Sequence, residues 1–174
     1  AYNASVNGIG EIRTELEVRM KRCGTAAAFL FMMPGPKMMW EFGEMGYDIS
    51  IQSKEGTDEL SSSYEGETKP PHWEFLEVPE RKNLFETYCK LLNFREQYAH
   101  VISDGEFVGN VDETDWPIRR IEITHPDLHF VLVGNFGIAT NICIPNLNNG
   151  EDWYDFMTGK SETGGPFSLP AGEF

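Results

Sequence analysis

One acidic residue of the sequence stands in a position that many proteins use to bind a ligand. Glu44 lies between Gly43 and Gly46, shortly after an apolar run at 38–40. Such a run predicts a short strand over 37–42, buried on both faces as in a parallel sheet. In α/β proteins, the residues that follow such strands face the ligand crevice. Glu44 is therefore a candidate binding residue, and an ordinary solvated loop acid is the alternative.

Two helical patterns flank this stretch. Apolar residues at three- and four-residue steps predict a helix over 11–33, which Pro34 ends. Pro79 suits the first position of a second helix that continues to about Gln97. We expect the two helices to pack beside each other on the same side of a sheet. Polar residues dominate the 49–78 segment between them, and a loop of this length is usually functional or mobile.

After Tyr98 the pattern changes to short β-rich runs separated by turn residues. Their roughly even spacing is typical of an antiparallel sandwich or barrel-like module. We therefore predict an α/β segment over residues 1–100, followed by an all-β antiparallel sandwich domain over residues 101–174. The predicted strands cover residues 118–124, 129–136, 139–144, 153–157 and 167–169.

The composition limits the classes of partner. The formal net charge is −14 and the pI about 4.6, which argues against nucleic acid and anionic membranes as partners. No stretch approaches the ~20 consecutive apolar residues of a membrane helix. We expect a secreted or periplasmic protein, with a cytoplasmic one as the alternative, and a processed or cut N-terminus because Ala1 is not Met. Cys23, Cys89 and Cys143 are widely spaced, and we expect buried free thiols.

The order of these motifs resembles the C-terminal part of an α-amylase-type enzyme of glycoside hydrolase family 13. Residues 34–46 look like the last strand of that family's (β/α)8, or TIM, barrel, in which a Pro-Gly corner precedes an apolar strand and a G-x-E-x-G-like turn. Residues 69–73 and 81–95 resemble the final barrel helix with its aromatic lead-in. Many members carry Gly two positions before the strand-end Glu, where this chain has Phe42. Matches to the family's small antiparallel C-terminal domain lie at residues 135–136, 153–155, 158–159 and 169–174.

The resemblance implies retaining cleavage of α-1,4-glucosidic bonds, which needs two carboxyl groups about 5 Å apart. The family places these groups and a third acid at the ends of earlier barrel strands. None of the four histidines here is followed by Asp, so the family's His-Asp pair is missing. The resemblance therefore implies that the catalytic carboxylates lie outside this chain, which is inactive alone. It implies no cofactor or metal in this chain, with calcium an option for the full-length enzyme.

Two residues of the barrel-like stretch receive roles from the resemblance. Glu44 shapes the floor of the sugar crevice or holds neighbouring catalytic groups. Trp40 stacks on a sugar ring or, in the simpler interpretation, belongs to the barrel core. The implied partners are an α-glucan or maltooligosaccharide, and either the rest of the barrel or a second copy at the exposed barrel edge. A branching or other transglycosylating enzyme is one alternative, and a non-catalytic carbohydrate-binding or structural module is the other.

Other aromatic and acidic residues have simpler interpretations. The pair at 153–154 is either a sugar platform or, as strand alternation predicts, one ring facing inward and one outward. Trp116-Pro117 is expected to anchor packing between the domains. Five acidic residues that could bind calcium are interpreted as a solvated loop, because no D-x-D-x-D-G pattern is present. They are Asp104, Glu106, Asp112, Glu113 and Asp115.

Overall fold

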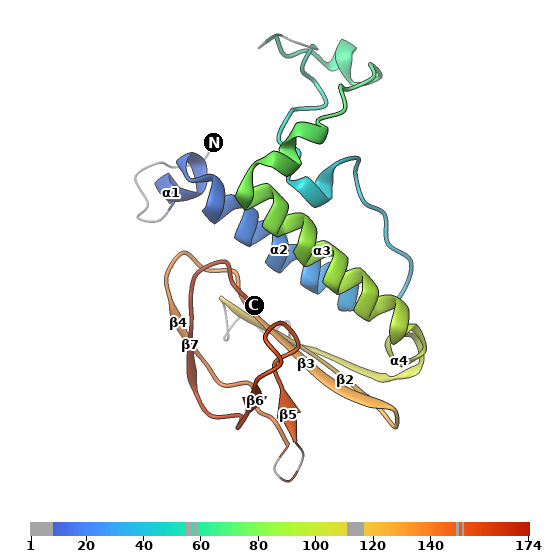
Figure 1. Ribbon diagram of the computed structural model, residues 1–174, viewed down its shortest axis with the longest axis vertical. Helices are drawn as coiled ribbons and strands as arrows, with labels where there is room; N and C mark the ends of the chain where they lie inside the picture. The colour runs from blue at the N-terminus through green and yellow to red at the C-terminus, as the bar shows by residue number, and fades with distance from the viewer. Residues whose placement is uncertain (1–8, 55–56, 58, 111–116, 149, 151) are drawn as a thin grey trace.

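Two long helices and several small antiparallel sheets make up the protein in a computed structural model (Figure 1). The long helices, α2 (Leu16–Met32) and α3 (Pro79–Gln97), lie side by side. A short helix, α1 (Ile9–Thr14), precedes the first, and α4 (Ala99–Asp104) follows the second. The mixed helix and strand content predicted from the sequence is confirmed. The structure describes residues 9–54, 57, 59–110, 117–148, 150 and 152–174.

Within the described residues, three small sheets follow the helices. The strands are β1 (Glu106–Asn110), β2 (Ile118–His125), β3 (Leu128–Asn135), β4 (Asn141–Cys143), β5 (Trp153–Tyr154), β6 (Ser161–Glu162) and β7 (Phe167–Leu169). The largest sheet has the order β1-β2-β3, and its strands are antiparallel. The other two sheets pair β4 with β7 and β5 with β6, also antiparallel. The strands predicted from the sequence therefore form, whereas α4, β1 and β6 were not predicted.

One hydrophobic core joins the helices to the largest sheet. Ile121 and Ile123 project from one face of β2 and are fully buried against the helices. On α2, Ala27 and Ala28 let the neighbouring elements approach closely, while Phe31 fills the space beside them. Burying each large side chain stabilises the fold by roughly 1.5–3 kcal/mol. The core includes residues from both sides of the predicted boundary near residue 100: Ala27, Ala28, Phe31, Met32, Leu91, Val101, Ile102, Ile121 and Ile123.

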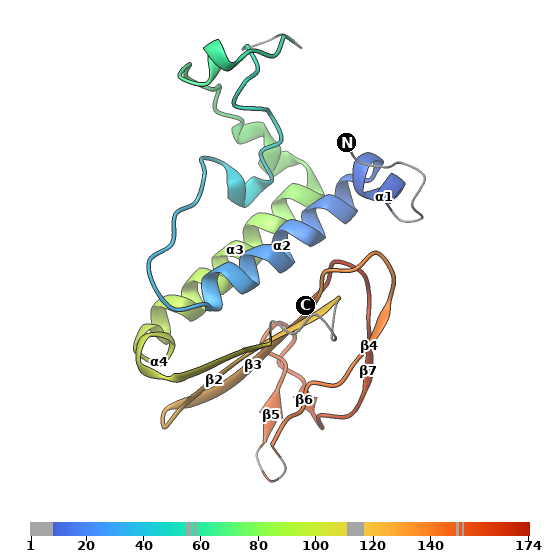
Figure 2. The ribbon, with the colours of Figure 1, turned by 180° about the vertical axis from the view of Figure 1, so that it is seen from behind.

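The two long helices run in the same direction. A Cβ at Gly24, in the first half of α2, would contact Leu84 near the start of α3. At the other end, Arg95 of α3 donates a hydrogen bond to the carbonyl of Phe31 near the end of α2. Parallel helices need a connection that runs back along them. Residues 33–48 provide it, from the end of α2 toward the start of α3 (Figure 2).

The polar 49–78 segment projects beyond the helices at the end opposite α4 (Figures 1 and 2). It contains two short 3₁₀ helices, η2 (Ser62–Tyr64) and η3 (Trp73–Glu77), and an isolated antiparallel bridge between Ser53 and Leu60. Lys69 is buried and donates hydrogen bonds to the carbonyl oxygens of Ser53 (2.8 Å) and Tyr64 (3.0 Å). The segment therefore has local order of its own, organised around one ammonium group.

The predicted buried strand over residues 37–42 is wrong for this chain. The backbone there is not hydrogen-bonded as a strand, and Met38 and Trp40 are 89% and 60% exposed. The physical reason is that none of the described strands runs beside it, so its backbone has no partner and its side chains have no cover. The two helix predictions are confirmed, with the first interrupted near Glu15.

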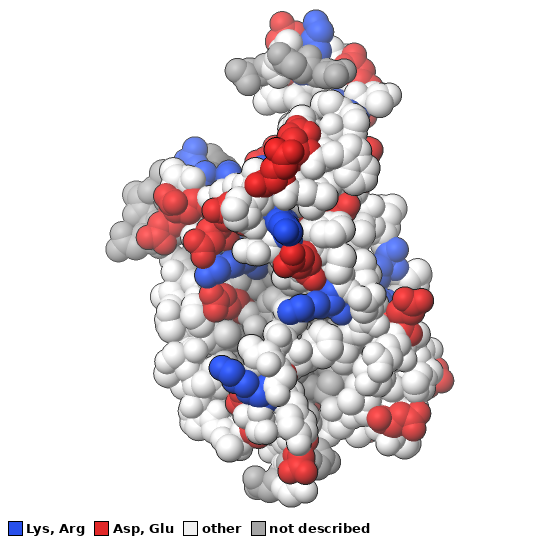
Figure 3. Space-filling view, in the orientation of Figure 1, with Lys and Arg blue, Asp and Glu red and all other residues white. Residues whose placement is uncertain are grey.

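All three cysteines are free, and burial raises the pKa of Cys23 and Cys143. The expectation of buried thiols is confirmed for Cys143, holds only in part for the half-buried Cys23 and is wrong for the exposed Cys89. Acidic and basic side chains are interspersed on the face shown in Figure 3. Among the described residues, none of the helices combines the length and apolar content needed to cross a bilayer.

A buried asparagine ties the C-terminal segment to the sheet. The Asn135 amide donates to the carbonyls of Ala139 and Leu169 (both 2.9 Å), and its Oδ1 accepts from the N–H of Gly137 (2.9 Å). Its backbone N–H and C=O bond residues 172–173. Because Asn135 is fully buried, the Leu169 carbonyl and the Gly137 N–H, which it bonds inside the protein, would lose their partner without it.

We expect Asn135→Ala to lower the free energy of unfolding by about 2–4 kcal/mol, because it removes two buried hydrogen bonds and one partly buried one and leaves the Leu169 carbonyl and the Gly137 N–H unsatisfied. Urea denaturation followed by circular dichroism measures the change. The matched control is Asn141→Ala, whose amide makes one exposed hydrogen bond to Ala139 and should change the stability by less than about 0.5 kcal/mol. Equal effects of the two substitutions would contradict the role of Asn135.

Candidate functional site

The candidate binding residue Glu44 lies in a short 3₁₀ turn, η1 (Gly43–Met45). Two residues around it have left-handed backbones, Phe42 with φ 55° and Gly46 with φ 67°. This conformation is easy for glycine but costs other residues roughly 1–2 kcal/mol. Phe42 is held in it by its buried ring, which packs edge-on against Trp73 with centroids 4.9 Å apart.

Arg81 attaches this turn to the first turn of α3. Its guanidinium is buried and donates to the carbonyls of Met45 (3.0 Å) and Gly46, and to the carboxylate of Asp48 (3.0 Å). It also lies 3.9 Å from the centroid of the Phe75 ring. Charge-assisted bonds from a planar donor fix both position and orientation. The turn that carries Glu44 therefore cannot shift independently of α3.

Arg95 fastens the other end of the same connection. It donates to the carbonyls of Phe31, Met33 (3.0 Å) and Gly35 (2.7 Å), which are the last residues of α2 and the Pro-Gly corner. Two arginines of α3 thus hold the ends of the connection, and residues 37–41 extend between them. The spacing of residues predicts that both arginines belong to the second helix. It does not predict the carbonyls they bind, because those lie in the 33–48 connection, which only the tertiary fold brings close to α3.

The Glu44 carboxylate and the Trp40 indole both have surface that a ligand could contact. Glu44 is half-buried, and within the part of the chain that the structure describes, no hydrogen bond or ion pair engages its carboxylate. Its charge lies close enough to Tyr88 to assist burial, the main cause, in raising the pKa of that phenol to about 12. Trp40 is 60% exposed and so is not part of the core of this chain. Trp73 is similarly exposed.

The other candidate residues lie elsewhere. Trp153 is half-buried, packs edge-on against His129 with centroids 4.7 Å apart, and donates Nε1–H to the Asn148 carbonyl (3.2 Å). Tyr154 points outward and is 63% exposed. The prediction of one inward and one outward ring is confirmed, and the two do not form a platform. Trp116 and the acidic residues at 112, 113 and 115 lie outside the described residues.

A polar network on the sheet was missed from the sequence. Glu122 accepts hydrogen bonds from Arg120 (2.8 Å) and bonds His129 (2.8 Å) across the β2–β3 pair. The Arg120 guanidinium holds the pKa of the Glu122 carboxyl below its ordinary value. Arg120 also donates to the Pro145 carbonyl (2.8 Å). Alternation along β2 predicts that Arg120 and Glu122 lie on the face opposite the isoleucines. The register of β2 against β3, which brings His129 to Glu122, could not be predicted from the sequence.

A hollow of about 450 Å³ lies between the first halves of α2 and α3 and the end of the chain. Met20, Leu84 and Phe174 line its apolar part, and Lys21 and Glu173 form an ion pair at its rim (2.9 Å). Neither Glu44 nor Trp40 lines it. The predicted site is consequently a half-buried turn that Arg81 holds, and it is not part of this hollow.

The chain matches none of the protein-family models compared with it, and no curated protein sequence matches it either. An assignment to a class therefore depends on the residues and the geometry described above.

The backbone at position 42 can be tested with a pair of substitutions. Phe42→Ala and Phe42→Gly both remove the ring and its contact with Trp73. Because φ is positive there, we expect Phe42→Gly to be more stable than Phe42→Ala by about 1 kcal/mol in urea denaturation. The same pair at exposed Leu92 in α3 should show the opposite order, since glycine is the poorer helix former. Ala exceeding Gly at position 42 would contradict the left-handed turn.

Proposed function

We propose that the chain is the C-terminal portion of an α-glucan-acting, α-amylase-like glycoside hydrolase that cleaves α-1,4-glucosidic bonds with retention. In this proposal residues 1–100 supply the last helix-strand-helix of the TIM barrel, in which residues 37–41 become a strand only beside the strands that the rest of the barrel provides, and residues 101–174 form the β domain beside it. The observation that carries the proposal is the left-handed backbone of Phe42. Phe42 occupies the position at which many members of the family have glycine, and it adopts a left-handed conformation that glycine reaches without strain.

The parallel helices give independent support. In a (β/α)8 barrel, consecutive helices run in the same direction, and each strand between them runs the opposite way. Here α2 and α3 are parallel, and residues 37–41 run back between them, tethered by Arg95 and Arg81. The segment carries Met38, Met39 and Trp40, all exposed. An apolar, unpaired segment held in this way is suited to enter a sheet supplied by the rest of the barrel.

In that setting Glu44 supports the substrate rather than catalysing the reaction. It follows the strand at the barrel face where such enzymes bind substrate, and its carboxylate has an unoccupied acceptor capacity for sugar hydroxyls or for neighbouring side chains. The catalytic carboxylates lie outside this chain, and it is inactive alone. The proposed location of the enzyme is secreted or periplasmic, with the cytoplasm as the alternative.

A non-catalytic carbohydrate-binding module is the second candidate. The exposed indoles of Trp40 and Trp73 favour it, because exposed aromatic rings offer flat apolar faces to sugar rings. A purely structural domain has no such observation in its favour, and a branching or other transglycosylating enzyme differs from the first candidate only in residues outside this chain.

The role of Glu44 is tested in the complete gene product. Glu44→Gln should lower kcat/KM on maltoheptaose by about tenfold or more, because a neutral amide replaces a charged acceptor worth about 1.5–3 kcal/mol. Glu41→Gln, an exposed acid of the same segment, is the control and should leave kcat/KM unchanged.

Calorimetry of the 174-residue chain with maltoheptaose separates the enzyme portion from the carbohydrate-binding module. Absence of binding fits the enzyme portion, whereas millimolar or tighter binding without Glu44-dependent hydrolysis favours the binding module.

The exposed segment also predicts association of the isolated chain. Residues 38–40 present an apolar, unpaired stretch of backbone, which favours pairing with another chain. We expect sedimentation velocity to show self-association that Met38→Ser together with Trp40→Ser weakens. Tyr154→Ser, which removes an equally exposed ring at β5, should leave association unchanged. A monodisperse monomer at all concentrations would overturn this prediction.

A further inference from the structure

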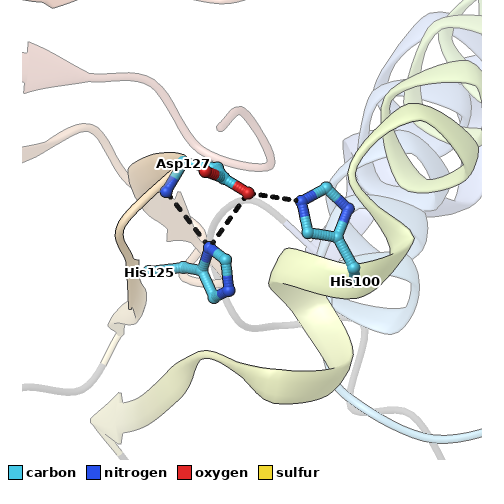
Figure 4. A group of neighbouring side chains, drawn as sticks. All are labelled: His100, His125 and Asp127. Atoms are coloured by element: carbon cyan, nitrogen blue, oxygen red, sulfur yellow. Dashed lines mark hydrogen bonds and ion pairs between the residues drawn. The ribbon is translucent and has the colours of Figure 1, made fainter.

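Two histidines and an aspartate converge where α4 meets the turn between β2 and β3 (Figure 4). His100 comes from the first turn of α4, His125 ends β2, and Asp127 lies in the turn that leads to β3. Asp127 Oδ2 lies 3.0 Å from His100 Nε2 and 3.8 Å from His125 Nδ1. The imidazole rings stand edge-to-face with centroids 5.4 Å apart. One carboxylate oxygen is thus shared by two imidazoles from different elements.

These separations are near those of a metal's ligand shell. Nitrogen and oxygen ligands about 2.0–2.1 Å from a tetrahedral zinc ion lie roughly 3.3 Å from each other. The distances of 3.0 and 3.8 Å lie on either side of that value, and one ligand atom from each residue lies within 4.8 Å of the others.

A backbone hydrogen bond and partial burial hold His125 in place without a metal. The backbone N–H of Asp127 donates to His125 Nδ1 (3.1 Å), which fixes the ring against the turn. His125 is the least exposed of the three, with 19% of its side chain accessible, against 52% for His100 and 65% for Asp127. A metal at Nδ1 would replace the N–H bond, and the freed N–H lies at an exposed turn that water reaches. The open side of the cluster leaves the fourth ligand position to water.

We propose that His100, His125 and Asp127 bind a divalent transition-metal ion of the zinc type. Two imidazoles and one carboxylate select zinc and its neighbours, whereas calcium and magnesium require mainly oxygen ligands. The ion would join α4 to the β2–β3 turn and so link the helices to the sheet at a second point besides the hydrophobic core. The proposal is independent of the α-glucan activity and departs from the expectation, drawn from the sequence, that the chain holds no metal.

Titration of the untagged, chelator-treated chain with Zn²⁺ by calorimetry tests the site. We expect one ion per chain with micromolar or tighter affinity. Since even a supporting residue of a metal site contributes about 10–100-fold in affinity, His100→Gln and His125→Gln should each weaken binding by at least about tenfold. Zinc should raise the Tm of the parent chain but not that of either variant. Co²⁺ should give visible absorption bands with the parent chain, which reports ligation without any substitution.

His72→Gln is the matched control, because His72 pairs with a single carboxylate, Glu74, on another part of the surface. It should leave zinc affinity unchanged, as should Cys89→Ser, which removes the exposed thiol. The proposal is overturned if the chain shows no saturable zinc binding, or if either control weakens binding as much as His100→Gln does. Circular dichroism establishes that each variant is folded. If a histidine variant is unfolded, the test is Co²⁺ broadening of the His100 and His125 NMR signals in the parent chain. Broadening of both signals supports the metal site, and its absence overturns the proposal.

Discussion

The common direction of α2 and α3 is the constraint on which the rest of the structure depends. Ala27 and Ala28 of α2 are small residues that allow close packing, and they share one core with the buried isoleucines of β2. Once the helices are parallel, the chain must run the length of the pair to begin again. The extended connection, its tethers and the projecting polar segment all follow from that requirement.

The arginines of α3 solve the problem that this connection creates. A segment without strand partners leaves carbonyl groups unpaired, and unpaired carbonyls near a core are costly. Arg81 and Arg95 supply several donors each to carbonyls at the two ends. Guanidinium is suited to this because it stays charged and presents its donors in a fixed plane. The strained backbone at Phe42 is tolerated for the same reason, since the residues on its C-terminal side are fixed.

The helices were predictable from the sequence because their signals are local: a period of three to four residues, Pro34 after the first helix and Pro79 at the start of the second. The β-rich runs were predictable for similar reasons. The buried strand was predicted wrongly because hydrophobicity at 38–40 indicates a preference for burial, and only another segment can satisfy it. The bonds of Arg81 to the Glu44 turn, and the meeting of His100 with Asp127, join residues 27 or more positions apart. Neither spacing nor composition encodes such pairs.

Because Arg95 and Arg81 hold its two ends, the exposed segment 37–41 is not needed to keep the two halves of the fold together. A protease that cut the backbone once, between Met39 and Trp40, would leave two pieces with no covalent link. They would remain together, because α2 in one piece packs against α3 and β2 in the other, and each new end is held by an arginine a few residues away. The connection that carries the candidate site is thus the part of the chain where an intact backbone matters least for the fold.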